Sequence, residues 1–316
     1  MKDVSINGFQ EMMESQLSVQ NANLLIGIFQ EKIRKNKMVG FIKWAGGKKQ
    51  LLKQFKPYFP KKINRYFEVF IGGGAVLFYI IKTYKPKYIF ISDINEELIN
   101  CYNVIKEDVE ELIKLLKEYK KKHNKEVYYE VRAEDPKLLS NTSRAGRFIY
   151  LNKTCFNGLY RVNSKGGFNV PIGSYKAPSI VMEKELREIS KLLKGVKIKV
   201  MSFENIIKIA KKGDFIYFDP PYYPIKKGKS FTTYTKGNFL EKEQEQLKDV
   251  FSKLDKKGCN IMLSNSDTKF IKDLYEDYNI NFVQANRMIN CDGNGRGKIN
   301  EVVVTNYKIK ETQNKL

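Results

Sequence analysis

Between residues 66 and 93 the chain runs through a strand, a glycine turn, a helix and a second strand. This order constrains the fold more than any other feature of the sequence. Residues 66–70 and Tyr88–Asp93 are apolar runs typical of strands, and a run of three glycines, 72–74, follows the first of them. Apolar residues recur at helical spacing from 75 to 80. The succession predicts one βαβ unit with parallel strands.

Later segments repeat this alternation of strands and helices. Strand-like runs occupy residues 196–201, Phe215–Phe218, 260–264 and 302–307, and helical patterns occupy residues 241–254 and 268–278. We therefore predict an α/β fold. A mostly helical, charged stretch from Glu96 to Ser190 interrupts it, and its length of about 90 residues suits a small inserted subdomain.

The charge of the chain favours a polyanionic partner. Lysine and arginine total 57 against 35 acidic residues, which gives a formal charge of +22. Neutralising phosphates releases condensed counterions, so nucleic acid is the plain interpretation. A lysine-rich composition that serves solubility is the alternative.

Histidine and cysteine usage excludes several classes of enzyme. His123 is the single histidine and stands within a lysine run, so we expect it to be a solvated surface residue. Zinc hydrolases and Ser-His-Asp or Cys-His machinery are nearly excluded. The four cysteines are scattered, which indicates reduced thiols rather than disulfides and predicts no metal site. The apolar stretch 24–29 is too short for a membrane span and no secretion signal precedes it, so we expect a soluble, cytoplasmic protein.

The glycine turn and the end of the second strand indicate a nucleoside-binding site. Glycines let the backbone approach a ligand closely because no Cβ intervenes. Asp93 stands at the strand end, 19 residues beyond Gly74, a spacing at which an acid accepts hydrogen bonds from ribose hydroxyls. A dinucleotide would also fit. The run of consecutive glycines and the lack of a hydride-transfer acid weigh against it.

The tetrapeptide Asp219-Pro220-Pro221-Tyr222 directly follows the strand Phe215–Phe218, where ligands of an open parallel sheet bind. These residues would suit an adenine as substrate. The amino nitrogen of adenine is a poor nucleophile because its lone pair is delocalised into the ring. Hydrogen bonds to the Asp219 carboxylate and the Pro220 carbonyl would favour a pyramidal nitrogen and stabilise its developing positive charge. Tyr222 would stack on the base. An ordinary strand-to-loop turn is the alternative.

These motifs together resemble the Dam-type family of DNA adenine methyltransferases, which includes the methylases that accompany GATC-cutting restriction enzymes. The resemblance covers residues 40 to about 308. The matching stretches are FIKWAGGK at 41–48, FEVFIGGG at 67–74, SDIN at 92–95, DPPY at 219–222, LSNS at 263–266 and EVVVTNY at 301–307. The resemblance implies a Rossmann-like sheet that binds S-adenosylmethionine, with an inserted, mostly helical DNA-recognition subdomain carrying a β-hairpin.

On this basis the chain divides into five segments. They are a helical extension at 1–36, a cofactor-binding part at 37–105, a recognition subdomain at 106–190 with its hairpin at about 152–178, a catalytic part at 191–310 and a tail at 311–316. The extension could track DNA or only pack against the rest of the protein.

The resemblance assigns residues to the two ends of the sheet. The expected catalytic residues are Asp219, Pro220 and Tyr222. The expected cofactor-binding residues are Trp44, Lys48, Phe70, Gly72, Gly74, Asp93 and Asp219. For Trp44 the alternative is core packing, and for Lys48 it is a solvated surface charge.

The insertion carries NKTCFNGLYRVN at 152–163 and FNVPIG at 168–173, which resemble the family's recognition hairpin. The expected DNA-binding residues are Lys43, Phe156, Asn157, Leu159, Arg161 and Pro171. Arg161 would bind a guanine bidentately, Leu159 and Pro171 would contact thymine methyls or base edges, and Phe156 would fill the gap left by a flipped adenine. A long surface loop is the alternative.

Two positions depart from the family's pattern. Phe156 stands where relatives often have tyrosine, which keeps the ring but loses a hydroxyl, and Ser174 stands where a relative has arginine. Beyond the catalytic motif, Lys226, Lys227 and Lys229 lie on a loop that we expect either to order over bound DNA as a lid or to remain solvated.

The leading hypothesis is a monomeric enzyme that methylates N6 of adenine in double-stranded DNA, within GATC. It would need no metal and no membrane, and a cognate restriction enzyme would not form a stable complex with it. A methyltransferase of the same chemistry acting on RNA or on a protein glutamine is the second hypothesis. A nucleic-acid-binding protein with an inactive site is the third.

Overall fold

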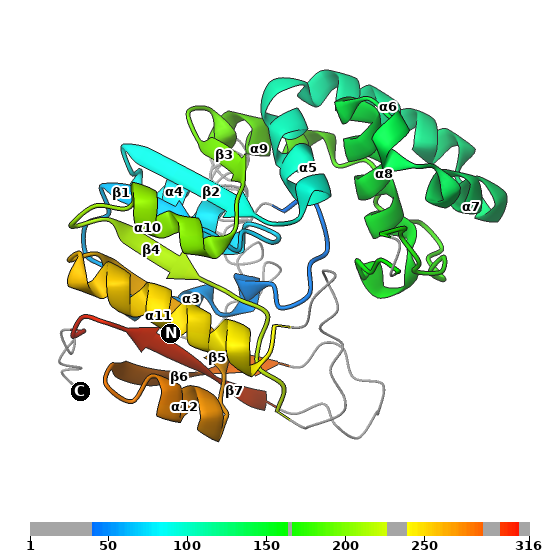
Figure 1. Ribbon diagram of the computed structural model, residues 1–316. Helices are drawn as coiled ribbons and strands as arrows, with labels where there is room; N and C mark the ends of the chain where they lie inside the picture. The colour runs from blue at the N-terminus through cyan, green and yellow to red at the C-terminus, as the bar shows by residue number, and fades with distance from the viewer. Residues whose placement is uncertain (1–39, 164–165, 226–238, 287–297, 310–316) are drawn as a thin grey trace, which may run out of the picture. The chain divides into compact units, whose positions relative to one another are not determined.

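A seven-stranded sheet runs through the part of the chain described by the structure, which is a computed structural model (Figure 1). The described residues are 40–163, 166–225, 239–286 and 298–309, and all of them belong to one compact unit, Val39–Leu316. The predicted extension at 1–36, the tail at 311–316 and the lysines of the proposed lid lie outside the described residues.

The sheet has the strand order β3-β2-β1-β4-β5-β7-β6. The first five strands in this order pair in parallel, whereas β7 is antiparallel to both β5 and β6. The strands are β1 (Arg65–Glu68), β2 (Tyr88–Asp93), β3 (Lys197–Val200), β4 (Phe215–Phe218), β5 (Asn260–Ser266), β6 (Asn279–Asn286) and β7 (Lys298–Thr305). The predicted α/β class and the parallel βαβ unit are confirmed.

Side chains of the central strands alternate between two covered faces. Phe67 and Ile216 belong to a buried cluster that also takes residues from α10 (Ile206–Ile209), α11 (Glu241–Lys256) and α12 (Lys269–Leu274). Tyr66 and Glu68 point to the opposite face. There Glu68 accepts a hydrogen bond from α4 (Ala75–Tyr84), and the Tyr217 ring contacts Phe55 of α3 (Leu52–Phe55).

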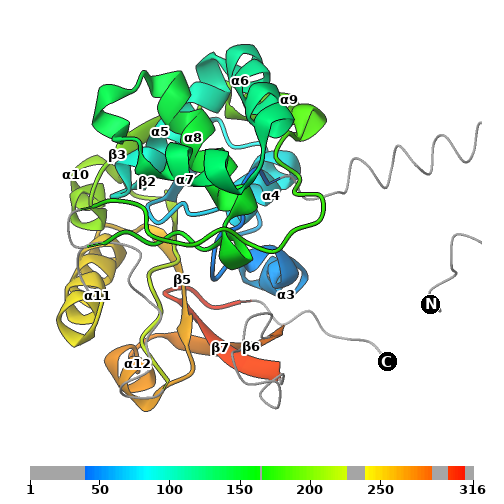
Figure 2. The same ribbon diagram turned by 90° about the vertical axis from the view of Figure 1, so that its right-hand side faces the viewer.

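The helices of the insertion gather away from α11 and α12 in both views (Figures 1 and 2). They are α5 (Glu96–Glu107), α6 (Val109–Lys122), α7 (Lys125–Ala133), α8 (Asn141–Thr154) and α9 (Glu183–Leu193). Short polar side chains begin three of them: Asn95, Asn124 and Ser140 each accept a backbone N–H of the first turn. The apolar stripes behind these caps pack α5, α6 and α7 against α8.

Short 3₁₀ turns connect several elements. They are η1 (Lys48–Gln50), η2 (Lys56–Tyr58), η3 (Pro136–Leu138), η4 (Phe156–Gly158) and η5 (Phe203–Asn205).

The antiparallel edge of the sheet differs from the prediction. The sequence did not predict β6, and β7 starts at Lys298 rather than at 302 and ends at Thr305 rather than at 307. The missed residues are largely polar, and Phe282 in the middle of β6 is 52% exposed. A solvated edge strand therefore lacks the apolar run by which the central strands were recognised.

The prediction for His123 was wrong, because this residue is not a solvated surface side chain. It follows α6, and the turn into α7 folds it against α8, where its Nδ1 lies 2.8 Å from the Tyr150 hydroxyl oxygen. The imidazole edge also meets the Tyr150 ring, at a centroid distance of 5.6 Å. Partial burial lowers the pKa of His123.

Candidate functional site

The glycine turn after β1 is shaped by close contacts that only glycine permits. Gly72 and Gly74 have φ angles of 45° and 70°, in the left-handed region. A Cβ on Gly74 would lie 2.5 Å from the Tyr102 hydroxyl, and that hydroxyl donates a hydrogen bond to the Gly72 carbonyl. A Cβ on Gly72 would lie 2.8 Å from the Trp44 indole. The indole therefore lies directly against the turn.

Asp93 closes the other side of the turn from the end of β2. Its carboxylate accepts the backbone N–H of Asn95 at 3.0 Å and that of Gly72 at 3.4 Å. Burial raises the pKa of Asp93 to about 6, although these hydrogen bonds oppose the shift. The acid is thus fixed by backbone donors beside the turn, where the sequence predicted a ribose contact.

Trp44 connects the glycine turn to the insertion. Its ring stacks on Tyr160, with centroids 5.9 Å apart, and on Phe148 of α8, with centroids 6.4 Å apart. The side chain is half-buried, so it is not a fully enclosed core residue. Phe70, also expected near the cofactor, stacks on Phe203 at 5.5 Å.

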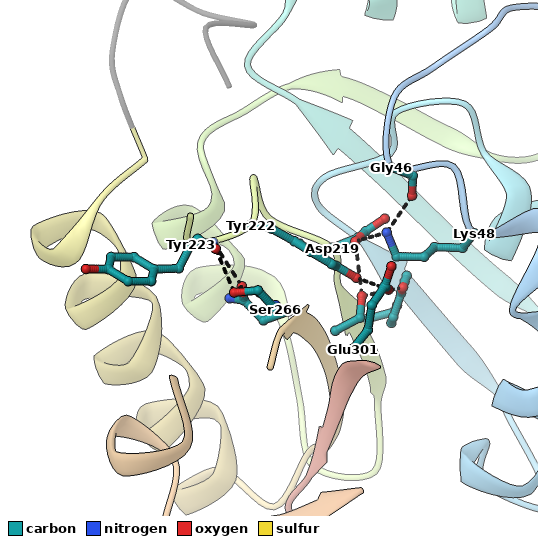
Figure 3. Close-up of polar contacts among 10 residues, drawn as sticks. Gly46, Lys48, Asp219, Tyr222, Tyr223, Ser266 and Glu301 are labelled. Carbon is teal, nitrogen blue, oxygen red and sulfur yellow. Dashed lines mark hydrogen bonds and ion pairs between the residues drawn. The ribbon is translucent and has the colours of Figure 1, made fainter. Parts of the chain in front are cut away.

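Lys48 is not a solvated surface charge, since only 3% of its side chain is exposed. Its ammonium nitrogen lies 2.8 Å from Oδ1 of Asp219 and donates to the Gly46 carbonyl at 2.5 Å (Figure 3). It also lies 4.5 Å from the centroid of the Tyr222 ring. Lys48 therefore contacts the predicted catalytic residues directly.

The loop that follows β4 brings Asp219 and Tyr222 together with a glutamate from β7. The Tyr222 hydroxyl donates to Oε2 of Glu301 at 2.7 Å (Figure 3). Burial raises the pKa of Asp219, and the Lys48 ammonium and the Ser264 hydroxyl oppose this effect. Burial likewise raises the pKa of Glu301. The Lys48 ammonium thus lowers the pKa of both carboxyl groups against the effect of burial.

The segment LSNS of β5 supports this loop. Ser264 donates to Oδ1 of Asp219 at 3.0 Å, Asn265 accepts the Tyr223 N–H at 3.1 Å, and Ser266 donates to the Tyr223 carbonyl at 2.7 Å. The Gln244 amide of α11 donates to the Pro221 carbonyl at 3.0 Å. The Pro221 carbonyl therefore accepts a hydrogen bond, whereas no hydrogen bond to the Pro220 carbonyl occurs among the described residues.

The predicted recognition hairpin is only partly present. Residues 152–154 form the last turn of α8, and the chain then returns antiparallel through two isolated bridges, Cys155↔Ile172 and Val162↔Phe168, without a continuous ladder. Asn157 and Gly158 have left-handed φ angles of 54° and 64°, which turn the chain sharply and interrupt an extended strand. Residues 155–175 are called the recognition loop below.

The residues expected to touch DNA lie mostly exposed on this loop. Phe156 is 51% exposed, and Asn157, Arg161 and Pro171 are also exposed, whereas Leu159 is half-buried. Ser174 is exposed as well. The Arg161 guanidinium crosses the loop to donate to the Asn169 side-chain oxygen at 2.7 Å.

Lys43 joins the recognition loop from the segment that carries Trp44. Its ammonium donates to the Tyr175 hydroxyl at 3.0 Å, and its aliphatic chain packs on Gly158 so closely that a Cβ there would lie 2.4 Å away. The buried Asn152 amide fixes this junction. Its Oδ1 accepts the Lys43 N–H at 2.8 Å, and its Nδ2 donates to the Lys43 carbonyl at 2.8 Å and to the Gly158 carbonyl at 3.0 Å.

The predicted site residues therefore form three neighbouring groups. Trp44 lies with Gly72, Gly74 and Asp93 at the glycine turn; Lys48, Asp219 and Tyr222 meet after β4; and Lys43 joins the recognition loop. Sequence reasoning assigned no role to Asn152, Ser264 or Glu301. All three lie within the motifs quoted above, but their hydrogen-bond partners are distant in the sequence and are known only from the structure.

Within the described ranges the chain lacks two further features. No helix there combines the length and apolarity that crossing a membrane requires. The same residues contain no group of three or more His, Cys, Asp or Glu side chains that could hold a metal ion.

The sequence is similar to those of known proteins. Residues 44–289 match the family described as D12 class N6 adenine-specific DNA methyltransferase. The type II methyltransferase M.MjaIII of Methanocaldococcus jannaschii is 47% identical over 284 residues, which cover 84% of this chain and 98% of that protein.

Two bacterial relatives extend the comparison. The type II methyltransferase M1.LlaDCHI of Lactococcus lactis subsp. cremoris is 44% identical, over 87% of this chain and 98% of its own length. The DNA adenine methylase of Escherichia coli K12 is 33% identical, over 86% of this chain and 95% of its own length. The chain therefore belongs to the D12 class of N6 adenine-specific DNA methyltransferases.

Proposed function

We propose that this enzyme transfers the methyl group of S-adenosylmethionine to N6 of an adenine flipped out of double-stranded DNA, within the sequence GATC. The observation that carries the proposal is that one short segment, residues 44–48, contacts both the glycine turn and Asp219. Trp44 lies against the glycine turn, and Lys48, four residues later, lies on Asp219. A donor at the turn and an acceptor at Asp219 would thus be neighbours.

The residues at the glycine turn fit the cofactor. The turn offers a surface without side chains, Asp93 offers a carboxylate for the ribose hydroxyls, and Trp44 offers an aromatic face. When bound, S-adenosylmethionine supplies an electrophilic methyl group. The role of the chain is to hold that group beside the nucleophile and to exclude water from it.

The acceptors after β4 fit an adenine amino group. The Asp219 carboxylate and the Pro220 carbonyl would accept its two N–H bonds, which favours a pyramidal nitrogen and stabilises the charge that develops on it. The Tyr222 ring, held through its hydroxyl by Glu301, would stack on the base. No histidine is required, because the amino proton becomes acidic only after methyl transfer.

The recognition loop supports a specific site in duplex DNA. Arg161 would bind O6 and N7 of a guanine, Leu159 and Pro171 would contact thymine, and Phe156 would fill the space left by the flipped adenine. Lys43, which donates to the Tyr175 hydroxyl, and Asn157 are both exposed and would add contacts to bases or phosphates. Flipping is needed because the paired amino group cannot reach the acceptors after β4.

We further propose that the protein acts as a cytoplasmic monomer, since one flipped base per event needs one site. The segments 37–105 and 191–310 would form the methyltransferase domain, and 106–190 would form the recognition subdomain. The relatives are named as type II methyltransferases and as DNA adenine methylases. A restriction enzyme, where one accompanies the protein, would act without forming a stable complex with it.

The test is methyl transfer from labelled S-adenosylmethionine to two duplexes that are identical except that one contains GATC and the other GTTC. The proposal expects label only on the GATC duplex, recovered as N6-methyladenine after digestion to nucleosides. Label on both duplexes would refute the site, and label recovered in another nucleoside would refute the acceptor atom.

A further inference from the structure

Resting on the proposed role of Asp219, we propose that Ser264 is a positioning residue for that carboxylate. Together with Lys48 it occupies one carboxylate oxygen and leaves the other oxygen turned toward the amino group of the substrate. The geometry of β4, β5 and η1 carries this inference.

The register of the sheet sets Ser264 beside Asp219. Strands β4 and β5 are parallel, and their last paired residues are Phe218 and Leu263. The next residue on each side is Asp219 and Ser264. Ser264 is fully buried inside β5, so its hydroxyl occupies a fixed position against the carboxylate. The contact is thus a consequence of strand pairing rather than of loop conformation.

A chain of hydroxyl groups gives this contact a direction. Ser264 Oγ lies 3.0 Å from Asp219 Oδ1 and 2.8 Å from the Tyr217 hydroxyl oxygen. A serine hydroxyl has one hydrogen, and the carboxylate can only accept. Ser264 therefore donates to Asp219, and Tyr217 donates to Ser264. Each donated bond polarises the next one and strengthens it.

The two oxygens of the Asp219 carboxylate have different surroundings. Oδ1 accepts the Ser264 hydroxyl at 3.0 Å and lies 2.8 Å from the Lys48 ammonium nitrogen. No hydrogen bond or ion pair to Oδ2 is found among the described residues. The Asp219 side chain is 20% exposed, whereas Lys48 and Ser264 are almost completely covered. Oδ2 is therefore the carboxylate oxygen that we assign to the substrate amino group.

The charged and titratable groups around Asp219 show why this hydroxyl is needed. Lys48 of η1 favours the ionised carboxylate, and burial disfavours it. Glu68 of β1 and Glu301 of β7 lie close enough for their charges to interact with Asp219. Burial, together with the Asp219 charge, raises the pKa of Tyr217 and of Tyr222 well above its usual value. A hydrogen bond from Ser264 stabilises the ionised form that accepts an amino N–H.

The main test is the substitution Ser264→Ala in the full-length enzyme. We expect kcat to fall about tenfold to a hundredfold, as for a lost hydrogen bond to a charged group. The dissociation constant for DNA should stay within about twofold, because the phosphate contacts are untouched. The acid limb of the pH–rate profile should move up by about one pH unit, since the lost bond favoured the ionised carboxylate.

A second variant separates orientation from folding. Ser264→Ala leaves the buried Tyr217 hydroxyl without its partner, which by itself destabilises the protein. The double variant Tyr217→Phe/Ser264→Ala removes both groups and should regain much of the lost thermal stability. The catalytic defect and the shifted acid limb should nevertheless persist. Ser252→Ala on α11, which removes a hydroxyl bonded to Tyr278 far from this site, is the matched control.

Two results would overturn the inference. One is a Ser264→Ala enzyme whose kcat stays within twofold and whose acid limb is unchanged. The other is a double variant that recovers activity together with stability, which would make Ser264 a packing residue only. Failure of the proposed function looks different: wild-type enzyme would transfer no methyl group to adenine, or Asp219→Asn would transfer it at the wild-type rate.

Discussion

The end of the sheet and the recognition loop are built in opposite ways. After β4, each functional side chain has several fixed partners: Asp219 contacts Lys48 and Ser264, and Tyr222 contacts Glu301. On the recognition loop the expected contact residues are exposed except for the half-buried Leu159, and within the described part of the chain Arg161 bonds to Asn169 on the opposite arm of the same loop. Under the proposed function, the groups that would stabilise charge are thus preorganised, whereas the groups that would contact DNA bases are exposed at the surface.

The recognition loop is nevertheless anchored at its base. Asn152 holds Gly158, and the Tyr128 hydroxyl donates to the Val170 carbonyl at 2.9 Å. Arg132 donates to the same carbonyl at 3.3 Å. An anchored stem and an exposed tip would let the proposed recognition loop contact DNA bases without disturbing the proposed acceptors after β4. If this division holds, substitutions in the two regions will affect different steps.

The largest effect is expected for Asp219→Ala. Loss of the acceptor should reduce the methyl-transfer rate by about a thousandfold or more on every DNA sequence. DNA affinity should change little, because contacts to phosphates dominate it. Single-turnover transfer and fluorescence anisotropy measure the two quantities. Asp249→Ala, on an exposed ion pair of α11, is the control. A methyl-transfer rate within tenfold of wild type would contradict the proposed role of Asp219 as an acceptor at the end of the sheet.

Lys48→Met should give the next largest effect, with a pH dependence of definite sign. The carboxyl must be ionised, so wild-type activity is present above the raised pKa of Asp219 and is lost as the pH falls through it. Lys48 lowers that pKa, and its removal should move the acid limb up by about one to three pH units.

The pH–rate profiles of wild type, Lys48→Met and the surface variant Lys253→Met test this prediction. An unshifted acid limb in Lys48→Met would show that the ion pair to Asp219 does not control the ionisation that matters.

Arg161→Ala should impair site choice rather than chemistry. We expect discrimination against a site altered at one guanine to fall by about 1–3 kcal/mol. The altered site should be methylated at its original rate, because the acceptors are intact. The ratio of kcat/KM on the GATC duplex to that on the altered duplex measures the discrimination. Arg187→Ala on α9 removes the same charge elsewhere and is the control. Unchanged discrimination would remove Arg161 from the reading surface.

The smallest effect is expected for Tyr128→Phe. This substitution removes one of two donors to the Val170 carbonyl at the base of the recognition loop. The free energy of unfolding should fall by about 0.5–1.5 kcal/mol, and the methyl-transfer rate should stay within about twofold. Denaturant unfolding and steady-state assays measure both, and a rate loss beyond tenfold would mean that the loop's base governs the chemistry.

The sequence alone was sufficient where a local pattern determines the structure. Apolar runs followed by an acid correctly predicted that Asp93 and Asp219 lie at the ends of strands, and the run of glycines correctly predicted the turn after β1. It was insufficient where distant segments meet. The contact of Ser264 with Asp219 depends on strand register, and the burial of Lys48 depends on how η1 packs against α3 and α4 and meets the loop after β4.

Three failures have local physical reasons. Asn157 and Gly158 adopt left-handed φ angles where the start of a hairpin was expected. The edge strand β6 is rich in polar residues and was therefore not recognised as a strand. A turn after α6 brings His123 against Tyr150. Each lacked the apolar periodicity on which prediction from sequence depends.

The central claim is that the transfer occurs at the end of the sheet and that the recognition loop chooses the site. The most direct test is a crossed assay of wild type, Asp219→Ala and Arg161→Ala on a GATC duplex and on one altered at a guanine. The account predicts that Asp219→Ala lowers both rates by the same factor, while Arg161→Ala lowers only the GATC rate. Equal loss on both duplexes for Arg161→Ala, or a changed ratio for Asp219→Ala, would contradict it.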